Sequence, residues 1–343
     1  MDALKNLKNS LTGGSPNNSR EKGSTVAKKS RRRRLVFDEI GVLGAVLLIM
    51  LILSLASPYF LTTNNLLRVG RQSSFVGLLA IGMAFVIASG QIDISVGRII
   101  TLVTFFMATL MENYGVNPWL AAAAGIGLGG VCGIVNGGLS LVFKVHPMII
   151  TLGTMNLYWG LAVGLSGARP IVVESESSFF ALCQGEILGI PTPFFAFLVT
   201  GLVCHIILKK ARYGRHVFAV GSNAQAAKYA GIREKWTRLS AMIMMGLLAG
   251  LAGAVILGFF QSFDPNIGAG MEMNTIAAAV IGGADLMGGY ASVIGAMLGT
   301  MLIGLLGNGL VLIGVGAYWN SFVTGAVIII AIGVGYLLRL LRR

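Results

Sequence analysis

The sequence predicts an all-α fold, a polytopic membrane bundle of about ten transmembrane helices with one short cytoplasmic helix. Apolar residues make up 55% of the 343 positions and charged residues only 11%, against roughly 25% charged residues in soluble domains. Glycine occupies 48 positions, which lie inside apolar stretches without a three-residue period. This is typical of closely packed membrane helices and not of collagen. The composition argues against a soluble globular enzyme and makes membrane lipid the expected surroundings.

Ten apolar stretches are long enough, or nearly so, to cross a hydrocarbon core about 30 Å thick. Residues 1–34 precede them as a predicted disordered, basic cytoplasmic tail, and residues 35–343 form the transmembrane domain. Because the tail is long and further spans follow, we interpret the first stretch as a retained span rather than a cleaved signal peptide. The predicted spans are residues 40–60, 73–90, 95–112, 119–143, 147–167, 191–209, 239–260, 273–284, 292–313 and 317–338.

Basic residues assign each connection between the spans to one side of the membrane. Residues 1–34 carry ten Lys and Arg and residues 208–238 carry eight, so these two segments account for the net charge of +13. With ten spans that start from a cytoplasmic tail, twenty-three basic residues fall inside, with Arg98 at the border, and three fall outside. Both termini are therefore predicted to be cytoplasmic, and the run Arg31–Arg34 is a topogenic anchor rather than a nucleic-acid site. The three outside residues are Arg68, Arg71 and Arg169.

Glycine spacing predicts where helices pack most closely. Lipid supplies no hydrophobic drive for helices to associate, and small residues let two backbones touch. A step of four residues places glycines on one face of a helix, and several tight crossings are therefore expected. The glycines concerned are Gly125, Gly129, Gly133 and Gly137, then Gly246 and Gly250, and finally Gly295 and Gly299.

Catalytic motifs are absent from the sequence. It has no G-x-x-x-x-G-K-[ST] phosphate loop, no H-E-x-x-H zinc motif and no G-x-S-x-G nucleophile turn. Its cysteines, Cys132, Cys183 and Cys204, lack metal-type spacing. We therefore expect no catalytic residue, no cofactor and no metal. Any uphill transport must draw on an ion gradient or on an ATPase in another chain.

Two acidic residues interrupt the membrane pattern in similar surroundings, Asp93 within Gly90–Gly97 and Asp285 within Gly282–Gly289. One interpretation is a turn at the cytoplasmic edge in which the carboxylate caps the next helix or acts as a hinge. The other is a polar gate or an ion site. We favour the cap or hinge.

Polar side chains within the spans are candidates for lining the path of a hydroxyl-rich solute. The same residue types also hydrogen-bond one helix to another, which is the commoner role for any single one. No cluster of Lys or Arg is expected at mid-membrane, so a neutral polar solute fits better than an anion. The candidates are Thr151, Asn156, Trp159, Asn274 and Asn308.

The cytoplasmic loop 210–238 contains a predicted helix of about eight residues, 223–230. Ser222 or Asn223 can cap its first amides, and Gly231 can take the left-handed position at its end. At 1.5 Å per residue the helix is roughly 12 Å long, too short to persist unless it docks. We therefore expect it to insert into a groove of a partner. Its small face consists of Ala226, Ala227 and Ala230.

Four segments carry a resemblance to a known family: Gly90–Gly97, Gly214–Gly231, Gly282–Gly289 and Leu306–Leu310. They are similar to segments in the permease subunits of bacterial ABC importers for monosaccharides, the ribose, xylose and galactoside type. The resemblance runs from about residue 40 to the C-terminus and is not specific to one sugar. The loop also resembles the wider ABC permease pattern E-A-A-x-x-x-G, but Gln225 replaces the acid and no I-x-L-P follows. This departure favours an architecture like the vitamin B12 permeases over the type-I importers.

The resemblance implies a permease subunit in the bacterial inner membrane, paired with a second copy or a close homologue. It also implies a cytoplasmic ABC ATPase and a periplasmic binding protein that delivers the solute. The competing hypothesis is an ion-coupled secondary transporter of a small polar solute, with Asp93 and Asp285 as coupling groups. A structural or signalling membrane protein is a third, but it would not need a capped docking helix. The residues expected to couple to the ATPase are Asn223, Gln225, Ala226, Ala227 and Gly231.

Overall fold

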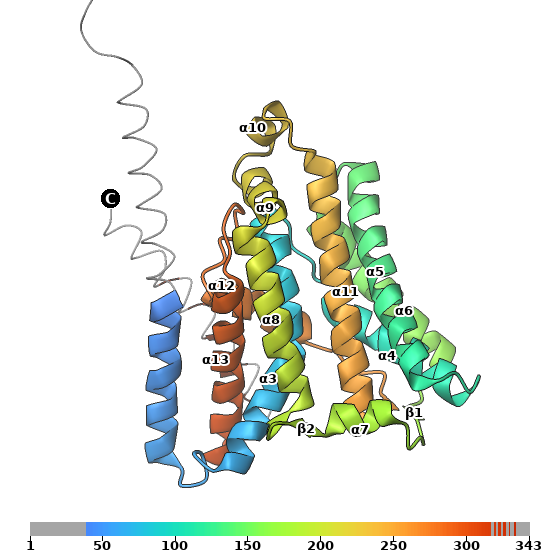
Figure 1. Cartoon of the computed structure of the whole chain (residues 1–343), viewed down its shortest axis with the longest axis vertical. Helices are drawn as coiled ribbons and strands as arrows, with labels where there is room; N and C mark the ends of the chain where they lie inside the picture. Colours follow the sequence, from blue (N-terminus) through green and yellow to red (C-terminus); the bar gives the residue numbers. More distant parts are fainter. Residues whose placement is uncertain are drawn as a thin grey trace, which may run out of the picture.

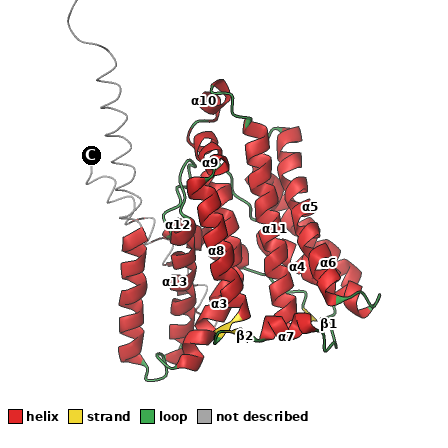
Figure 2. Ribbon diagram, in the orientation of Figure 1, coloured by secondary structure: helices red, strands yellow, loops and turns green. Residues whose placement is uncertain are grey.

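A computed structural model describes residues 39–316 and, beyond them, Trp319, Phe322, Val323, Gly325, Ala326, Ile329 and Gly333. The predicted tail, residues 1–34, and most of the tenth predicted span, residues 317–338, lie outside the described residues. Within the described part the chain is almost entirely helical, and its strands are two-residue pieces (Figure 2).

Helices occupy every predicted span within residues 39–316, which confirms the all-α bundle. The predicted spans 95–112 and 273–284 correspond to two shorter helices, α4 (Val96–Glu112) and α12 (Met271–Ile281). Seven of the described helices are long and apolar enough to cross a membrane. They are Glu39–Ala56, α3 (Thr63–Ala88), α5 (Pro118–Phe143), α6 (Pro147–Ser166), α8 (Thr192–Lys210), α11 (Glu234–Phe260) and α13 (Val293–Leu312).

Short elements mark the two ends of the bundle (Figure 1). At one end α9 (Arg212–Ser222) and α10 (Ala224–Tyr229) connect α8 to α11, and we call this the α10 end. At the opposite end, the α7 end, lie α7 (Ser178–Gln184) and the strands β1 and β2. β1 (Ile171–Val172) pairs antiparallel with β4 (Ser262–Phe263), and β2 (Glu186–Ile187) pairs antiparallel with β3 (Ile190–Pro191).

Proline and capping side chains set where two of the long helices begin. α5 starts at Pro118 and α6 at Pro147, the first helical position, where the missing N–H of proline has no intrahelical partner to lose. The residues before them, Asn117 and His146, each accept a backbone N–H with the side chain. α6 ends before Gly167, whose φ of 62° is the left-handed conformation that glycine takes readily.

The predicted glycine crossing is confirmed between α5 and α11. A Cβ on Gly129 would collide with the carbonyl oxygen of Gly246, and a Cβ on Gly246 would collide with that of Gly129. α12 and α13 approach each other in the same way, because a Cβ on Gly295 would collide with the carbonyl of Gly282. Backbone contact of this kind replaces the hydrophobic drive that lipid does not supply.

Candidate functional site

The connection between α8 and α11 folds into two helices at the α10 end. Asn223, one of the two predicted caps, accepts a hydrogen bond from the Ala226 amide at 2.9 Å and starts α10. Gly231 has φ +80°, and the Ile232 amide donates to the Ala227 carbonyl at 3.0 Å. This is the left-handed ending that the glycine predicts. α10 has only six residues, so it is stabilised by the hydrogen bonds at its two ends and by its contacts with neighbouring helices.

The alanines of α10 do not form the uniform docking face that the sequence predicts. Ala227 is only 4% exposed, because it faces the protein itself. Gln225, Ala226 and Ala230 are exposed. Tyr229 is 82% exposed, and its hydroxyl accepts a hydrogen bond from Gln225 Nε2 at 3.1 Å. The surface that α10 offers to a partner is therefore more polar and more aromatic than expected.

α9 is a helix beyond those predicted from the sequence. Val217 and Val220 are buried on its inner side, and the Tyr213 hydroxyl accepts a hydrogen bond from Ser240 of α11 at 3.1 Å. Burial raises the pKa of the Tyr213 phenol above its ordinary value, so this group stays neutral. The signal that could have predicted α9 is the helical spacing of its inward-facing residues, Tyr213, Val217 and Val220. Gly221, in the same stretch, obscures this pattern.

Three of the four segments that carry the family resemblance meet beside α9: Gly90–Gly97, Gly214–Gly231 and Gly282–Gly289. A Cβ on Gly221 would collide with the Ala88 carbonyl oxygen and come within 2.5 Å of the Gly289 amide nitrogen. A Cβ on Gly288 would lie 2.7 Å from the Gly90 Cα, and the Gly289 amide donates to the Ala88 carbonyl at 2.9 Å. We call these five residues the glycine junction. It joins the end of α9 to the turn that carries Asp93 and to the turn that carries Asp285 by backbone contact.

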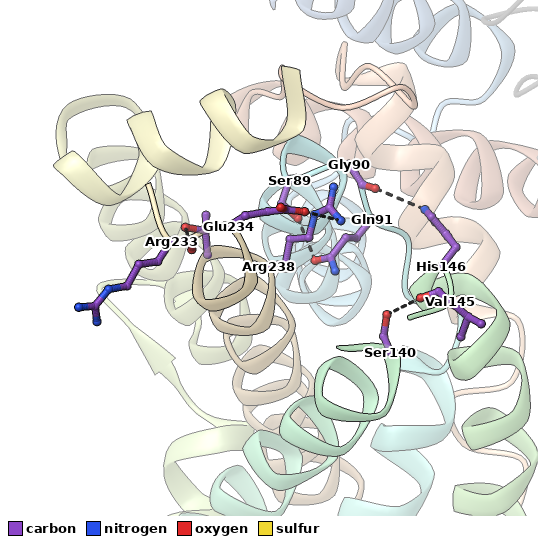
Figure 3. Close-up of polar contacts among 10 residues, drawn as sticks. Ser89, Gly90, Gln91, Ser140, Val145, His146, Arg233, Glu234 and Arg238 are labelled. Carbon is purple, nitrogen blue, oxygen red and sulfur yellow. Dashed lines mark hydrogen bonds and ion pairs between the residues drawn. The ribbon is translucent and has the colours of Figure 1, made fainter. Parts of the chain in front are cut away.

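The connection between α5 and α6 lies at the same end of the bundle. His146 Nε2 stands 3.4 Å from the Gly90 carbonyl oxygen (Figure 3). In the first turns of α11, Glu234 and Arg238 form an ion pair at 3.0 Å (Figure 3). Lys144, in the α5–α6 connection, and the α9–α10 loop therefore share one side, as charge counting predicts.

Asp93 lies next to the glycine junction along the chain and is fully buried. Its Oδ1 accepts hydrogen bonds from the amide and the hydroxyl of Ser95 at 2.8 and 2.7 Å, and its Oδ2 accepts one from Asn136 Nδ2 at 3.3 Å. Asn136, on α5, in turn accepts from Thr154 at 2.7 Å and from Tyr158 at 2.9 Å, both on α6. The carboxylate therefore fixes the turn before α4, whose N-cap position is Ser95 and has no side-chain cap bond. It also ties this turn to α5 and, through Asn136, to α6.

Asp285 does not cap the helix that follows it. Its Oδ1 accepts a hydrogen bond from the Met287 amide at 3.2 Å, within its own turn. α13 begins at Val293 and is capped by Ser292, whose hydroxyl oxygen accepts from the Gly295 amide at 3.1 Å. The cap falls to Ser292 because Asp285 is too far along the chain from the helix start.

Within the described residues no group of three or more His, Cys, Asp or Glu is placed to hold a metal ion.

Two of the candidate path residues, Thr151 and Asn308, join separate segments of the bundle. Thr151 is fully buried, and its hydroxyl oxygen accepts a hydrogen bond from the Ile94 amide at 3.2 Å. Asn308 and Asn65 exchange two hydrogen bonds at 2.9 and 3.0 Å, which link α13 to α3. Asn308 therefore has the helix-to-helix role that the sequence left as the alternative, and Thr151 joins α6 to the turn before α4.

The other three candidates keep more of their surface accessible. Asn156 is exposed on α6, where its amide donates to the Leu152 carbonyl at 3.2 Å. Trp159, one turn further on, is 40% exposed and donates from Nε1 to the Pro265 carbonyl at 3.3 Å. Asn274 is partly buried on α12. The structure therefore brings Asn156 and Trp159 together and does not gather all five candidates into one lining.

Arg98 lies deeper in the bundle than the sequence predicts. Its guanidinium carbon stands 5.6 Å from the centroid of the Trp159 ring, and Trp159 lies about 18 Å along α6 from its start at Pro147, at 1.5 Å per residue. The structure therefore places the Arg98 guanidinium inside the bundle, away from the α10 end of α6. Residues 89–95 pass into the bundle before α4 begins, so that Ser95 already accepts a hydrogen bond from Asn136, within α5.

Comparison with known proteins finds relatives over almost the whole chain. The family model described as "Branched-chain amino acid transport system / permease component" matches residues 65–332. The ribose import permease protein RbsC of Bacillus subtilis (strain 168) is 36% identical over 315 residues, which cover 90% of this chain and 97% of that protein. The D-allose transport system permease protein AlsC of Escherichia coli (strain K12) is 36% identical over 323 residues, 93% of this chain and 98% of that protein. The L-arabinose ABC transporter permease protein AraH of Azospirillum brasilense is 31% identical over 297 residues, 87% of each chain.

No solved structure matches the chain, so the assignment depends on the sequence relatives and on the helical architecture. The described helices include seven that are able to cross a membrane, which agrees with a multi-pass membrane protein. The family model and these relatives both cover most of the chain. The chain therefore belongs to the family of transport-system permease components, multi-pass membrane subunits that are not themselves catalytic.

Proposed function

We propose that this protein is the permease subunit of an ATP-driven ABC importer that carries a monosaccharide, or a similar small polar solute, across the inner membrane of a bacterium. One observation carries the proposal. Three relatives that align over 87% or more of this chain are named for three different monosaccharides, ribose, D-allose and L-arabinose. The lack of a phosphate-loop motif in the sequence assigns ATP hydrolysis to a partner chain.

In this proposal the α10 end faces the cytoplasm, both termini lie on that side, and an ABC ATPase docks there. The eight basic residues in 208–238 support this orientation. The exposed residues of α10, with Gln225, Ala226 and Tyr229 among them, form the contact surface. The glycine junction carries movement of α9 to the turns before α4 and α13, because backbone contact leaves no flexible side chain to absorb it.

The α7 end then faces the periplasm, where a solute-binding protein docks. A hollow of about 550 Å³ opens there, and its lining includes Glu174, Glu176, Gln184 and Gln261. A second permease subunit, either another copy or a close homologue, completes the pathway, as the resemblance to ABC permeases implies. These assignments give each end of the bundle one partner.

The experiment that tests the proposal is reconstitution in liposomes. The permease is combined with the ABC ATPase and the secreted binding protein encoded by its flanking reading frames, and uptake of radiolabelled D-ribose, D-allose and L-arabinose is measured. We expect uptake of at least one of the three sugars only when ATP, the ATPase and the binding protein are all present. Failure of all three sugars with the complete set would contradict the monosaccharide assignment.

The ion-coupled alternative predicts the opposite dependence. A secondary transporter would take up solute with the permease alone, driven by a proton or sodium gradient. The geometry supports the importer instead, because Asp93 is held by Ser95 and Asn136 while Asp285 holds a separate turn. Gradient-driven uptake without any ATPase would decide for the alternative.

A further inference from the structure

Two oppositely charged side chains lie inside the bundle with atoms that have no partner. Arg98 is in the first turn of α4, and its Nη1 is buried without a hydrogen-bond partner among the described residues. Glu272 is in the first turn of α12, and its Oε2 is likewise buried and without a partner in that part of the chain. Burying polar atoms of charged groups without hydrogen bonds is costly, by several kcal/mol for an isolated charge.

Glu272 and Trp159 each approach the first turn of α4, at Gly97 and at Arg98. A Cβ on Gly97 would lie 2.5 Å from Glu272 Oε2, so the carboxylate reaches the backbone position next to Arg98. The absence of a side chain at Gly97 is what admits it. At the next residue, the guanidinium carbon of Arg98 stands 5.6 Å from the centroid of the Trp159 ring. Trp159 is itself fixed by donation to the Pro265 carbonyl, in the segment that leads to α12.

At this depth in the bundle, charged side chains with only a structural role would be energetically unfavourable. Trp159 lies roughly 18 Å from the α10 end of α6, while the hydrocarbon core is about 30 Å thick. Charged residues at such depth face the bundle interior or a water-filled path and mark solute routes. Trp159 remains 40% exposed and Asn156 is exposed one turn away on the same helix, so the Trp159 part of the group is accessible from the side of α6.

We propose that Arg98, Trp159 and Glu272 form a contact point for a neutral, polyhydroxylated solute such as a monosaccharide on its way through the bundle. The guanidinium donates to hydroxyl oxygens and the carboxylate accepts from hydroxyl groups. The indole face packs against the apolar C–H face of a sugar ring. One positive and one negative group give the site no net charge, so it does not select for an anion or for a cation. The inference deepens the proposed function and depends on it.

The test uses the complete importer, with permease, ATPase and binding protein in liposomes. The variants are Trp159→Ala, Glu272→Gln and Arg98→Gln, and uptake of D-ribose, D-allose and L-arabinose is measured together with ATP hydrolysis. We expect uptake of the transported sugar to fall about tenfold, while ATP hydrolysis stimulated by the loaded binding protein stays within about twofold of the wild type. We also expect Trp159→Ala to change the ratio of uptake among the three sugars, which a loss of folded protein would not do.

Two residues provide matched controls. Trp119 is 46% exposed and donates from Nε1 to Ser178, but it lies at the α7 end. Arg71 has a buried Nε without a partner among the described residues and stands 4.9 Å from the Phe259 ring, also toward the α7 end. Trp119→Ala and Arg71→Gln are expected to keep both the uptake rate and the ratio among sugars.

The possible outcomes separate this inference from the proposed function. If the wild type takes up none of the three sugars with ATP, both are overturned. If the wild type transports and the three variants keep its rate and its sugar ratio, the contact point is overturned and the function stands. If the variants lose uptake and ATP hydrolysis together, and Arg71→Gln loses as much, the three residues serve packing and the inference is overturned.

Discussion

Gly221 lies near the end of α9 and Gly231 follows α10, and each is glycine for a different physical reason. At Gly221 the backbone of other segments leaves no room for a Cβ, which would collide with the Ala88 carbonyl oxygen. At Gly231 nothing lies within 4 Å of the Cβ position, and the constraint is the φ of +80° alone. A side chain at Gly231 therefore costs roughly 1 kcal/mol in backbone strain, whereas one at Gly221 pushes packed segments apart.

We expect Gly221→Ala to weaken the coupling between the ATPase and the bundle more than Gly231→Ala does. The added methyl group separates the Gly289 amide from the Ala88 carbonyl and costs about 1–3 kcal/mol, as overpacking does in a close-packed core. The measurements are thermal unfolding in detergent and ATP hydrolysis stimulated by the binding protein. Equal, wild-type behaviour of the two variants would contradict a role for the glycine junction in coupling.

Asp93 is expected to act through its hydrogen bonds rather than by carrying an ion. In Asp93→Asn the amide oxygen still accepts from Ser95, and only the 3.3 Å contact with Asn136 is lost, at about 1 kcal/mol. Asp93→Ala leaves the amide and the hydroxyl of Ser95 without their acceptor, at about 1–3 kcal/mol for each unsatisfied group, while Asn136 keeps its hydrogen bond to Ser95 Oγ. ATP-driven uptake should therefore survive in Asp93→Asn and fall in Asp93→Ala. A gradient-dependent uptake that Asp93→Asn abolishes would support the ion-coupled alternative.

At the scale of elements, α10 combines a buried anchor with an exposed surface in only six residues. Ala227 is 4% exposed and faces the protein, while its neighbour Ala226 is exposed. The local signals for the helix, Asn223 and Gly231, are short-range and are readable from the sequence. Which alanine faces inward depends on how α10 rests on the bundle, and no local pattern in six residues specifies that.

The two neighbouring alanines give a matched pair of substitutions. Ala227→Glu places a carboxylate in a buried position and should displace α10, which lowers both stability and stimulated ATP hydrolysis. Ala226→Glu should leave stability within about 0.5 kcal/mol and still reduce stimulated ATP hydrolysis, because it alters the surface that the ATPase contacts. Full ATPase stimulation in Ala226→Glu would remove α10 from the coupling surface.

At the scale of the whole molecule, the sequence was sufficient for the spans and for the glycine faces at which helices pack closely, but not for the pairing of α5 with α11. Hydropathy and glycine spacing are properties of single helices, and the structure confirms both. The depth of Arg98 and the pairing of Asn308 with Asn65 were not predictable in the same way. Each depends on contacts between segments far apart in the chain. The sequence pattern of a polar residue in a span is the same whether that residue pairs with another helix or lines a solute path.

Cysteine labelling tests the orientation of the molecule in the membrane, because the structure shows which positions are accessible at each end. Cys132, Cys183 and Cys204 are all buried, and Cys183 packs against Gly258, so an impermeant thiol reagent should leave the wild type unlabelled in intact cells. Leu188, 92% exposed at the α7 end, and Tyr229, 82% exposed at the α10 end, are suitable sites. Because the basic residues cluster at the α10 end, Leu188→Cys should be labelled in spheroplasts and Tyr229→Cys only after permeabilisation. Labelling of Tyr229→Cys from outside would invert the bundle and place the ATPase at the α7 end.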